Sequence, residues 1–387
     1  MQLYFADLHI HIGRTEKGKP VKITGSRNLT LKNILEIASS RKGLDIIGII
    51  DCHSPEVIEE MKELIHNGEM IELEQGGLRF QNTTLIPGSE IEIYDSNCHG
   101  PIHVLAYFPT IATMELFSNW MSEHMKNIQL SSQRIYCDGI TLQKVVREFG
   151  GLFIPAHVFT PFKSLYGKGV QKSLTEVFDP TLIDAIELGL SSDTEMVKGI
   201  SELEQYTFVT NSDAHSLGKL AREYQQIQLN DANFNELTLA LQEKKGRKIV
   251  ANFGLNPLLG KYHSTACANC GEPLSNDEET CEKCGSHHFI KGVSIRIKEL
   301  SDLSEQNRVR PEYIHQVPLD FIPGVGPKTI EKLLDHFGTE MNILHKVTLE
   351  QLSEVVPSKI AKVIDMARKG ELKFNVGGGG TYGKIQE

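Results

Sequence analysis

The stretch FADLHIHIG, residues 5–13, places an aspartate and two histidines at every second position. Successive side chains of a β-strand point to opposite faces, so Asp7, His9 and His11 share one face and the apolar residues between them share the other. The polar face can hold a metal ion while the apolar face packs in a core. We therefore expect a strand that serves both, with Asp7 as a supporting residue and not as a ligand.

The composition is that of an ordinary folded protein. The chain has 387 residues, 40% of them hydrophobic and 23% charged, which suits two or three domains. Its net charge of -10 repels nucleic acid at long range, so any DNA binding must come from local donors. No apolar run approaches the ~18 residues of a membrane span and no signal-peptide pattern is present, so we expect a cytoplasmic protein without a membrane partner.

Strand and helix patterns alternate through the first two thirds of the chain. Residues 29–43 have helical spacing, with Thr30 as N-cap and Gly43 as the stop. Further strands are expected at 44–51, 84–93, 102–108, 152–157, 183–189 and 207–215, and further helices near 55–67, 141–149 and 193–205. This alternation predicts an α/β fold with a mostly parallel sheet, open or closed into a barrel.

Side chains that bind metals recur where these strands end, and a β/α barrel collects its chemistry at the C-terminal ends of its strands. The candidates are His9, His11, Asp51, His53, Glu90, His103, His157, Asp213 and His215. Burying so many of them without a metal would leave uncompensated charges and unpaired donors. Imidazole with carboxylate suits Zn, Mn or Fe better than calcium. The set exceeds the needs of one ion, so we expect two or three.

Clustered divalent ions are the usual device for phosphoester cleavage, because they acidify a bridging water and stabilise the leaving oxygen. The ordered motifs over roughly residues 1–250 resemble the PHP (polymerase and histidinol phosphatase) superfamily. The resemblance implies a distorted β/α barrel with a di- or trinuclear site, in which the nine candidates are the metal ligands and catalytic residues. The barrel ions would be Zn, Mn or Mg.

One departure from the PHP pattern follows the opening histidines. Many PHP domains carry a further Asp or His ligand there, whereas this chain continues IGRTEKG. Either Arg14 or Glu16 replaces that ligand, or one metal position is weaker. Neither residue is assigned to the metal.

The sequence CANCGEPLSNDEETCEKCGS, residues 267–286, gives two Cys-x2-Cys pairs. Each pair is followed by a glycine and can form a tight knuckle, and four thiolates close a tetrahedral zinc site with no open position. The ligands are Cys267, Cys270, Cys281 and Cys284. The other three cysteines stand far apart, which argues against disulfides. We expect a structural zinc ribbon.

The stretch DFIPGVGPKTIEKLLDHFG, residues 320–338, has the form of a helix-hairpin-helix. Gly324 and Gly326 permit a tight turn before a helix, whose free amides together with Lys328 can bind a phosphate of DNA. Residues 356–364 form a degenerate second copy that lacks the glycines. The alternative is an ordinary helical bundle with a Gly-Pro turn.

The expected domains are a PHP metal-dependent phosphoesterase barrel at 1–255, a zinc ribbon at 256–299, an all-α helix-hairpin-helix region at 300–372 and a Gly-rich tail at 373–387. The tail is either a flexible segment or a backbone that passes close to a ligand. The whole order of modules is similar to the endonuclease Q family. That resemblance implies cleavage 5′ to deaminated bases (hypoxanthine, uracil, xanthine) and abasic sites in double-stranded DNA, leaving a 3′-hydroxyl and a 5′-phosphate. It would make the protein nucleoid-associated when bound to DNA. The sequence identifies no protein partner.

An enzyme that reads an altered base in a duplex usually flips it into a pocket. The loop after His157 and the segment after the strand at 183–189 offer aromatic, basic and hydroxyl groups for such a pocket, although plain loop packing is the alternative. The candidates are Phe159, Phe162, Lys163, Tyr166, Lys168, Ser191 and Ser192.

Two other functions fit the same barrel. One is a PHP phosphatase that acts on a small phosphomonoester and has no use for the ribbon or the hairpins. The other is a non-catalytic DNA-lesion binding protein in which the barrel ions are structural.

Overall fold

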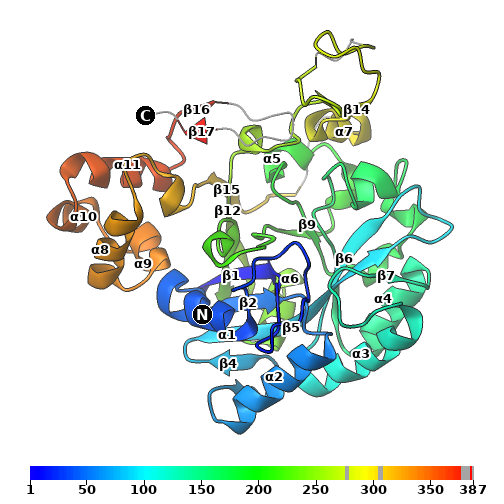
Figure 1. The fold of residues 1–387 in the computed structure, drawn as a ribbon, viewed down its shortest axis with the longest axis horizontal. Helices are drawn as coiled ribbons and strands as arrows, with labels where there is room; N and C mark the ends of the chain where they lie inside the picture. The colour runs from blue at the N-terminus through cyan, green and yellow to red at the C-terminus, as the bar shows by residue number, and fades with distance from the viewer. Residues whose placement is uncertain (275–278, 304–307, 376–383, 386–387) are drawn as a thin grey trace.

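The computed structural model describes residues 1–274, 279–303, 308–375 and 384–385 of the chain (Figure 1). The strands are β1 (Gln2–Ile10), β2 (Ile46–Ile49), β3 (Ile71–Glu72), β4 (Leu78–Phe80), β5 (Thr83–Ile93), β6 (Ile102–Tyr107), β7 (Arg134–Ile135), β8 (Leu152–Pro155), β9 (Ala185–Glu187), β10 (Thr207–Val209), β11 (Tyr224–Leu229), β12 (Lys248–Gly254), β13 (Ala266–Cys267), β14 (Phe289–Ile290), β15 (Glu312–His315), β16 (Phe374–Asn375) and β17 (Lys384–Ile385). The α-helices are α1 (Leu31–Glu36), α2 (Pro55–His66), α3 (Ile111–His124), α4 (Gly139–Glu148), α5 (Thr194–Val197), α6 (Phe234–Leu241), α7 (Val293–Leu300), α8 (Pro327–Phe337), α9 (Glu340–His345), α10 (Leu349–Val355) and α11 (Ser358–Arg368). A π-helical segment, η1 (Ile37–Lys42), continues α1.

The strands close into a distorted barrel, in which β1 lies between β11 and β2. Strands β1, β2 and β5 are parallel, whereas β6 runs antiparallel to both β5 and β8. Strands β9 and β10 form a separate parallel pair. Hydrogen bonds join this pair to its neighbours on both sides: Asp184 N–H donates to Phe153 O over 2.9 Å, and His11 N–H donates to Ala214 O over 3.1 Å. The expected α/β barrel is confirmed, but its sheet is mixed and not mostly parallel.

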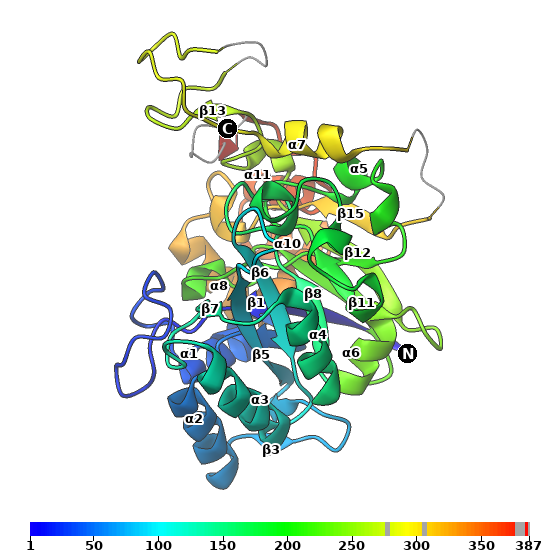
Figure 2. The same ribbon diagram turned by 90° about the vertical axis from the view of Figure 1, so that its right-hand side faces the viewer.

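Strand β1 is buried on both of its faces from Phe5 to Ile10. Leu8 packs with apolar residues of β2, β6 and β8, while Asp7 and His9 are fully buried on the opposite face. Helices α2, α3 and α4 lie on the outside of the strands, as Figure 2 shows. The expected double use of this strand, apolar packing on one face and polar groups on the other, is what the fold provides.

The helix expected at 193–205 is much shorter in the structure. Asp193 accepts a hydrogen bond from Met196 N–H and starts α5, but the helix ends after Val197. The carbonyl of Gly199 then accepts from the N–H groups of Asp302 and Leu303, which lie a hundred residues further along the chain. This long-range pairing replaces the helical hydrogen bonds, so the local periodicity gave the wrong length.

Several elements were absent from the pattern expected from the sequence, among them β11, α6, β12, α3 and β15. Helix α3 begins at Thr110, whose side chain accepts from Thr113 N–H in a capping box. Strand β15 lies in the region expected to be all-helical, and it pairs in parallel with β12 at the edge of the barrel sheet. The C-terminal region therefore begins as a strand of the barrel sheet and continues as four helices.

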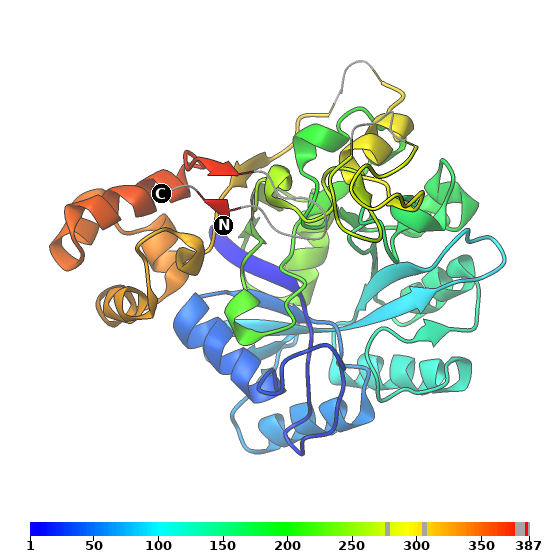
Figure 3. The same cartoon turned by 45° about the horizontal axis from the view of Figure 1, so that its top comes forward.

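The C-terminal helices pack against the barrel through α9 (Figure 3). Lys42 forms a 2.8 Å ion pair with Glu340, and both side chains are buried. Gly43, in the left-handed region at φ 78°, ends η1 directly against Thr339. The ring of His345 stacks on Phe5 with centroids 4.5 Å apart. These contacts hold the helices in a fixed place beside the first strands.

Two further expectations concern the Gly-rich tail and membrane-spanning helices. Most of the expected Gly-rich tail falls on residues 376–383 and 386–387, which lie outside the described part of the chain. Among the described residues, no helix has both the length and the apolar character needed to cross a membrane.

We predict that acid weakens the contact between α9 and the barrel. Burial lowers the pKa of His345 to about 4, and the positive charges of Arg368 and Lys346 add to the effect. The pKa of a histidine in the unfolded chain is about 6.5. Between these pH values the unfolded chain binds the extra proton, so the contribution is complete above about pH 6.5 and is lost toward pH 4. The ring faces Tyr224, whose hydroxyl lies 2.6 Å from Nε2.

Chemical unfolding of the wild type and of His345→Gln at pH 7 and pH 4.5 measures this contribution. The wild type should lose up to about 3 kcal/mol more stability than the variant between the two pH values. Equal losses would show that His345 is not the titrating group.

Candidate metal centre

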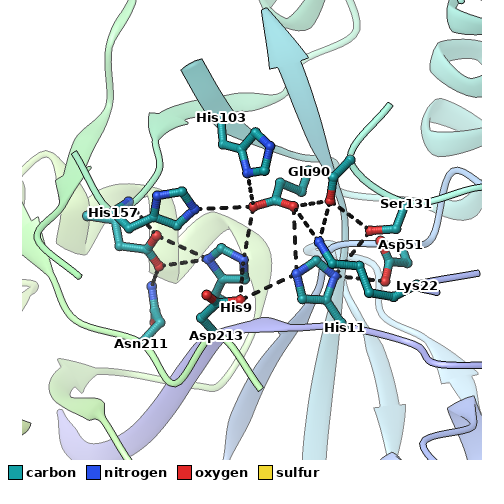
Figure 4. Close-up of polar contacts among 12 residues, drawn as sticks. His9, His11, Lys22, Asp51, Glu90, His103, Ser131, His157, Asn211 and Asp213 are labelled. Carbon is teal, nitrogen blue, oxygen red and sulfur yellow. Dashed lines mark hydrogen bonds and ion pairs between the residues drawn. The ribbon is translucent and has the colours of Figure 1, made fainter. Parts of the chain in front are cut away.

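Seven of the nine expected ligands meet at one end of the barrel. Figure 4 labels all of them except His215. They come from the end of β1, from β5 and β6, and from the segments that follow β8 and β10. Their ligand atoms form three overlapping groups, each with all atoms within 4.8 Å of one another: His9, His11 and Glu90; His11, Asp213 and His215; and Glu90, His103 and His157. The first group is fully buried.

The donor atoms of this cluster are placed as metal ligands would be. The Nε2 atoms of His9 and His11 are buried and have no hydrogen-bond partner among the described residues. His103 instead turns its Nδ1 toward the cluster, 2.8 Å from Glu90 Oε1. His9 Nε2 lies 3.5 Å from both Glu90 Oε1 and Asp213 Oδ1. Ligand atoms about 2.1 Å from one ion at tetrahedral angles stand about 3.4 Å apart. The residues therefore fit divalent ions.

Glu187, which the sequence analysis did not select, orients His9. Its Oε1 accepts from His9 Nδ1 over 3.0 Å and from Asn211 Nδ2 over 2.7 Å, and its Oε2 accepts from His157 N–H over 2.8 Å. Because the carboxylate only accepts, His9 Nδ1 carries a proton and Nε2 points its lone pair into the cluster. Glu187 ends β9, so the rule that found the other strand-end carboxylates could have found it too.

Neighbouring charges shift the pKa values of the ligand side chains in this cluster. Burial alone would raise the pKa of Glu90, but His103 and Lys22 hold it well below its usual value. Burial also opposes a charged His9, yet Glu187 and Asp213 raise its pKa well above the ordinary value. The surroundings favour positive charge at the centre of the cluster, which divalent ions would supply.

Two of the expected ligands, Asp51 and His53, lie outside these three groups. His53 Nδ1 lies 2.9 Å from Ser89 Oγ and Nε2 lies 3.3 Å from Leu130 O, so both ring nitrogens have protein partners. Asp51 Oδ2 accepts from His11 Nδ1 over 3.0 Å and from Ile12 N–H over 2.8 Å. We correct the assignment of His53, which is a buried structural residue. Asp51 orients His11 through Oδ2, but its Oδ1 is buried without a hydrogen-bond partner among the described residues, so its role as a ligand stays a prediction.

The backbone at two candidate ligands is unusual. His157 has φ 31° and Asp213 has φ 45°, both in the left-handed region that residues other than glycine rarely adopt. Gly189 packs directly on His157, where an added Cβ would come within 2.8 Å of the histidine Cβ. Such strain is typically retained where surrounding structure enforces it at a functional site.

Asp7 supports the cluster from behind. It is fully buried and accepts from Ser212 N–H over 3.1 Å and from Ala221 N–H over 3.0 Å. It therefore ties β1 to the segment that carries Asp213.

The loop after the opening histidines brings a lysine to the cluster and no ligand. Arg14 Nη1 donates to Gly18 O over 2.8 Å, and Glu16 Oε1 accepts from Lys32 N–H over 3.3 Å, so both are occupied elsewhere. Lys22 Nζ lies 3.1 Å from Glu90 Oε2. No sequence pattern indicated Lys22, because its contact depends on how the loop folds back.

The four cysteines form a second group with ligand spacing. Their sulfur atoms all lie within 4.8 Å of one another, with Cys267 3.5 Å from Cys284 and Cys270 3.6 Å from Cys281. Four sulfurs about 2.3 Å from one tetrahedral ion would be about 3.8 Å apart. The expected metal-binding group is present, and its four sulfurs leave no position open for chemistry.

Most of the residues expected to line the base pocket are buried in the protein core. Phe159 and Tyr166 are fully buried and stacked with centroids 5.2 Å apart, and Tyr166 Oη donates to Glu202 over 2.8 Å. We correct their assignment, because neither side chain can face a base in this arrangement. Ser191 and Ser192 are also buried, and Ser192 Oγ donates to Leu188 O over 2.8 Å.

Three members of that set are exposed, and one of them, Lys163, lies beside the metal centre. Phe162 is 46% exposed, and Lys163 forms a 2.8 Å ion pair with Glu92, whose Oε2 is 3.7 Å from His103 Nε2. Lys168 is exposed. A cavity of about 850 Å³ lies instead between α5 and residues 308–315, away from these side chains.

The expected phosphate-binding turn is exposed before α8. Gly324 has φ 81°, Gly326 immediately precedes the helix, and Pro327 is its first residue. Lys328 follows in the first turn and is exposed. Val325 N–H donates to Ile322 O over 3.0 Å and closes the turn before the helix.

Comparison with known proteins identifies relatives over the whole chain, although no family model matches. The uncharacterized protein YqxK of Bacillus subtilis is 59% identical over 386 residues, covering both chains completely. The uncharacterized protein MJ0043 of Methanocaldococcus jannaschii is 38% identical over 252 residues, which are 59% of this chain and 31% of that protein.

Two solved structures match the full chain. The lesion-specific endonuclease PfuEndoQ from Pyrococcus furiosus is 30% identical with a TM-score of 0.85, and the match covers 100% of this chain and 95% of that one. Endonuclease Q in complex with a 27-mer duplex substrate, with an abasic lesion at the active site, is 31% identical with a TM-score of 0.84 and coverage of 100% and 96%.

We predict that Glu187→Gln weakens metal binding without unfolding the barrel. The amide can present a donor to His9 Nδ1 and so disturbs the ring orientation, which typically costs 10–100-fold, or about 1–3 kcal/mol, in metal affinity. Competition with a chromophoric chelator measures the affinity. Glu202→Gln, at a carboxylate outside the metal groups, should retain wild-type affinity; equal losses in both variants would contradict the role of Glu187.

Proposed function

The chain belongs to the endonuclease Q family, and from this premise we propose that it cuts double-stranded DNA on the 5′ side of deaminated bases (hypoxanthine, uracil and xanthine) and abasic sites. The products would be a 3′-hydroxyl and a 5′-phosphate. The observation that carries the proposal is the full-length match to an endonuclease Q bound to a duplex with an abasic lesion at its active site.

The residues of the metal centre would perform the cleavage. We assign His9, His11, Glu90, His103, His157, Asp213 and His215 as ligands, with Glu90 shared between two of the groups. Divalent zinc, manganese or magnesium bound there would provide a nucleophile at neutral pH and stabilise charge on the phosphate. Glu187 and Asp51 keep His9 and His11 in the required orientation.

The other modules would place the DNA. We assign the barrel to residues 1–255, the zinc ribbon to 256–299 and the helix-hairpin-helix region to 300–372. The amides before α8 and the Lys328 ammonium would bind one backbone phosphate, as helix N-termini commonly do. Zinc at the four cysteines would fix the ribbon and take no part in the reaction.

The damaged base would leave the duplex and enter the rim of the metal centre. Phe162 offers an exposed ring for stacking, and Lys163 and Lys168 offer donors for a base edge or a phosphate. Lys163 lies close to the ligands through Glu92 and His103, so a nucleotide bound at Lys163 would have its phosphate near the ions.

An end-labelled duplex with a single hypoxanthine or uracil tests the proposal. With Mg²⁺ or Mn²⁺ the wild type should nick 5′ to the lesion and leave an undamaged duplex intact, whereas EDTA or Asp213→Asn should abolish nicking. Asp213 is chosen because its carboxylate lies within 3.5 Å of both His9 and His11.

Other outcomes identify the alternative functions. Turnover of p-nitrophenyl phosphate without any cut at the lesion would favour a phosphatase of small monoesters. Tight binding to the lesion duplex with no hydrolysis of either substrate would favour a non-catalytic binder. Either result would overturn the proposed activity.

We predict that Lys328→Ala weakens DNA binding equally for lesion and undamaged duplexes. Loss of one phosphate contact should lower the slope of log affinity against log salt by about 1. Fluorescence anisotropy in the Asp213→Asn background measures binding without cleavage. Lys332→Ala, one turn further along α8, is the matched control; an equal effect of both substitutions would indicate general charge and not a directed contact.

A further inference from the structure

Strand β5 continues beyond the metal centre on the face that carries Glu90. Successive side chains of a strand alternate between its two faces, so Glu90, Glu92 and Tyr94 share one face, and the four residues from Glu90 to Tyr94 span about 13 Å. Glu90 belongs to two of the ligand groups, and Glu92 Oε2 lies 3.7 Å from His103 Nε2. Tyr94, which directly follows β5, therefore lies further out on a surface that begins at the ligands.

Strand β7 widens this surface beside β5 (Figure 1). The two strands are parallel, with Glu92 opposite Arg134 and Ile93 opposite Ile135. Ile93 and Ile135 are buried, whereas Arg134 and Tyr136 are exposed. Alternation along β7 thus places Arg134 and Tyr136 on the same face as Glu92.

An arginine contacts two exposed aromatic rings on this surface. The Arg134 guanidinium carbon lies 4.8 Å from the ring centroid of Tyr94 and 5.6 Å from that of Tyr136, and Arg134 Nη2 donates to Tyr94 O. Lys126 Nζ lies 6.0 Å from the Tyr136 ring centroid. Tyr94 is 38% exposed and Tyr136 is 52% exposed, so both rings are open to solvent. We call Tyr94, Lys126, Arg134 and Tyr136 the tyrosine–arginine face.

The two cations of this face have no carboxylate partner. Among the described residues, Arg134 and Lys126 contact the two rings and one main-chain oxygen but form no ion pair. Lys163, which is nearer to the ligands, is by contrast paired with Glu92 over 2.8 Å. Exposed rings beside unpaired cations combine groups that stack on nucleobases with groups that bind phosphates. In a chain with a net charge of -10, such a face complements a polyanion by local charge.

We propose that the tyrosine–arginine face binds the DNA strand beside the cut, with the rings of Tyr94 and Tyr136 stacked on unpaired bases and with Arg134 and Lys126 on their phosphates. The occupant is a short run of nucleotides released from pairing next to the lesion, because bases in an intact duplex are covered by their neighbours. A strand with one phosphate at Glu90 reaches this face within a few nucleotides. The inference deepens the proposed function and rests on it for its substrate.

Fluorescence anisotropy in the Asp213→Asn background measures binding without cleavage. One probe is a fully paired duplex with an abasic site, and the other is the same duplex with about four mismatched nucleotides beside that site. The unpaired nucleotides should strengthen binding by the parent protein. Combined Tyr94→Ala and Tyr136→Ala should remove this gain, by at least about fivefold for each ring, which is the lower end of what base stacking contributes.

Two matched variants separate stacking from other effects. Combined Tyr94→Phe and Tyr136→Phe keeps both rings and should bind both probes as the parent does. Leu116→Ala, at a 53% exposed apolar residue of α3, should also match the parent. Unchanged binding in the double alanine variant would overturn the proposal. Equal losses in the phenylalanine and alanine variants would assign binding to the hydroxyl groups and would overturn the stacking.

The charge of Arg134 is tested by salt. Arg134→Gln should lower the slope of log affinity against log salt by about 0.7 for the mismatched probe, the value for one phosphate of a single strand. An unchanged slope would contradict a phosphate contact at Arg134.

The outcomes separate this inference from the proposed function. If the wild type nicks no lesion duplex, the proposed function fails, whereas a loss of affinity in the double alanine variant still supports a DNA-binding face. If that variant binds DNA as the parent does but no longer self-associates in sedimentation, the face is a contact between copies and the inference fails. Thermal unfolding checks that each variant is folded. If the double alanine variant does not fold, Tyr136→Ala alone, at a residue outside the strands, decides.

Discussion

The Nε2 atoms of His9, His11 and His103 lie buried without hydrogen-bond partners among the described residues, and each unsatisfied group of this kind costs about 1–3 kcal/mol. The barrel places them there by bringing the ends of its strands together. Their other nitrogens are held by carboxylates: Glu187 for His9, Asp51 for His11 and Glu90 for His103. The fold thus leaves buried lone pairs that bound divalent ions would satisfy.

The sequence predicts the parts of this centre that depend on local pattern. Alternation in β1 indicates which face His9 and His11 share, and strand-end position finds Glu90, His103, His157, Asp213 and His215. The Cys-x2-Cys pairs are recognisable for the same reason, since their spacing is fixed within a few residues. The helix before Gly43 follows from periodicity and a stop signal.

The errors arise where a partner comes from elsewhere in the chain. The position of His53 after a strand suggests a ligand, but its two ring nitrogens contact Ser89 and Leu130. The sequence places Phe159 and Tyr166 in a loop, but their rings are buried and stack on each other. The helix expected at 193–205 ends early because residues 302 and 303 bind Gly199. Lys22 was missed for the same reason, because no pattern within one segment places it in the cluster. Glu187 was missed although it ends β9, where the strand-end rule could have found it.

The helices of the C-terminal region are joined to the barrel by packing and by main-chain hydrogen bonds. The Lys42–Glu340 pair and the stacking of His345 on Phe5 fix α9 against the first strands. Because α8 packs on α9, the turn before α8 is joined to the barrel through these contacts. A duplex phosphate bound at that turn would lie at a set distance from the cutting site.

Strand β15 also has a protective effect. It covers the outer edge of β12 in parallel register from Ala251 to Gly254, and an uncovered edge strand is a template for pairing with other chains. The barrel thus borrows its last strand from a segment that is synthesised about sixty residues later. A chain shortened after β12 would expose that edge and tend to self-associate, so solubility of the catalytic barrel depends on residues that take no part in its chemistry.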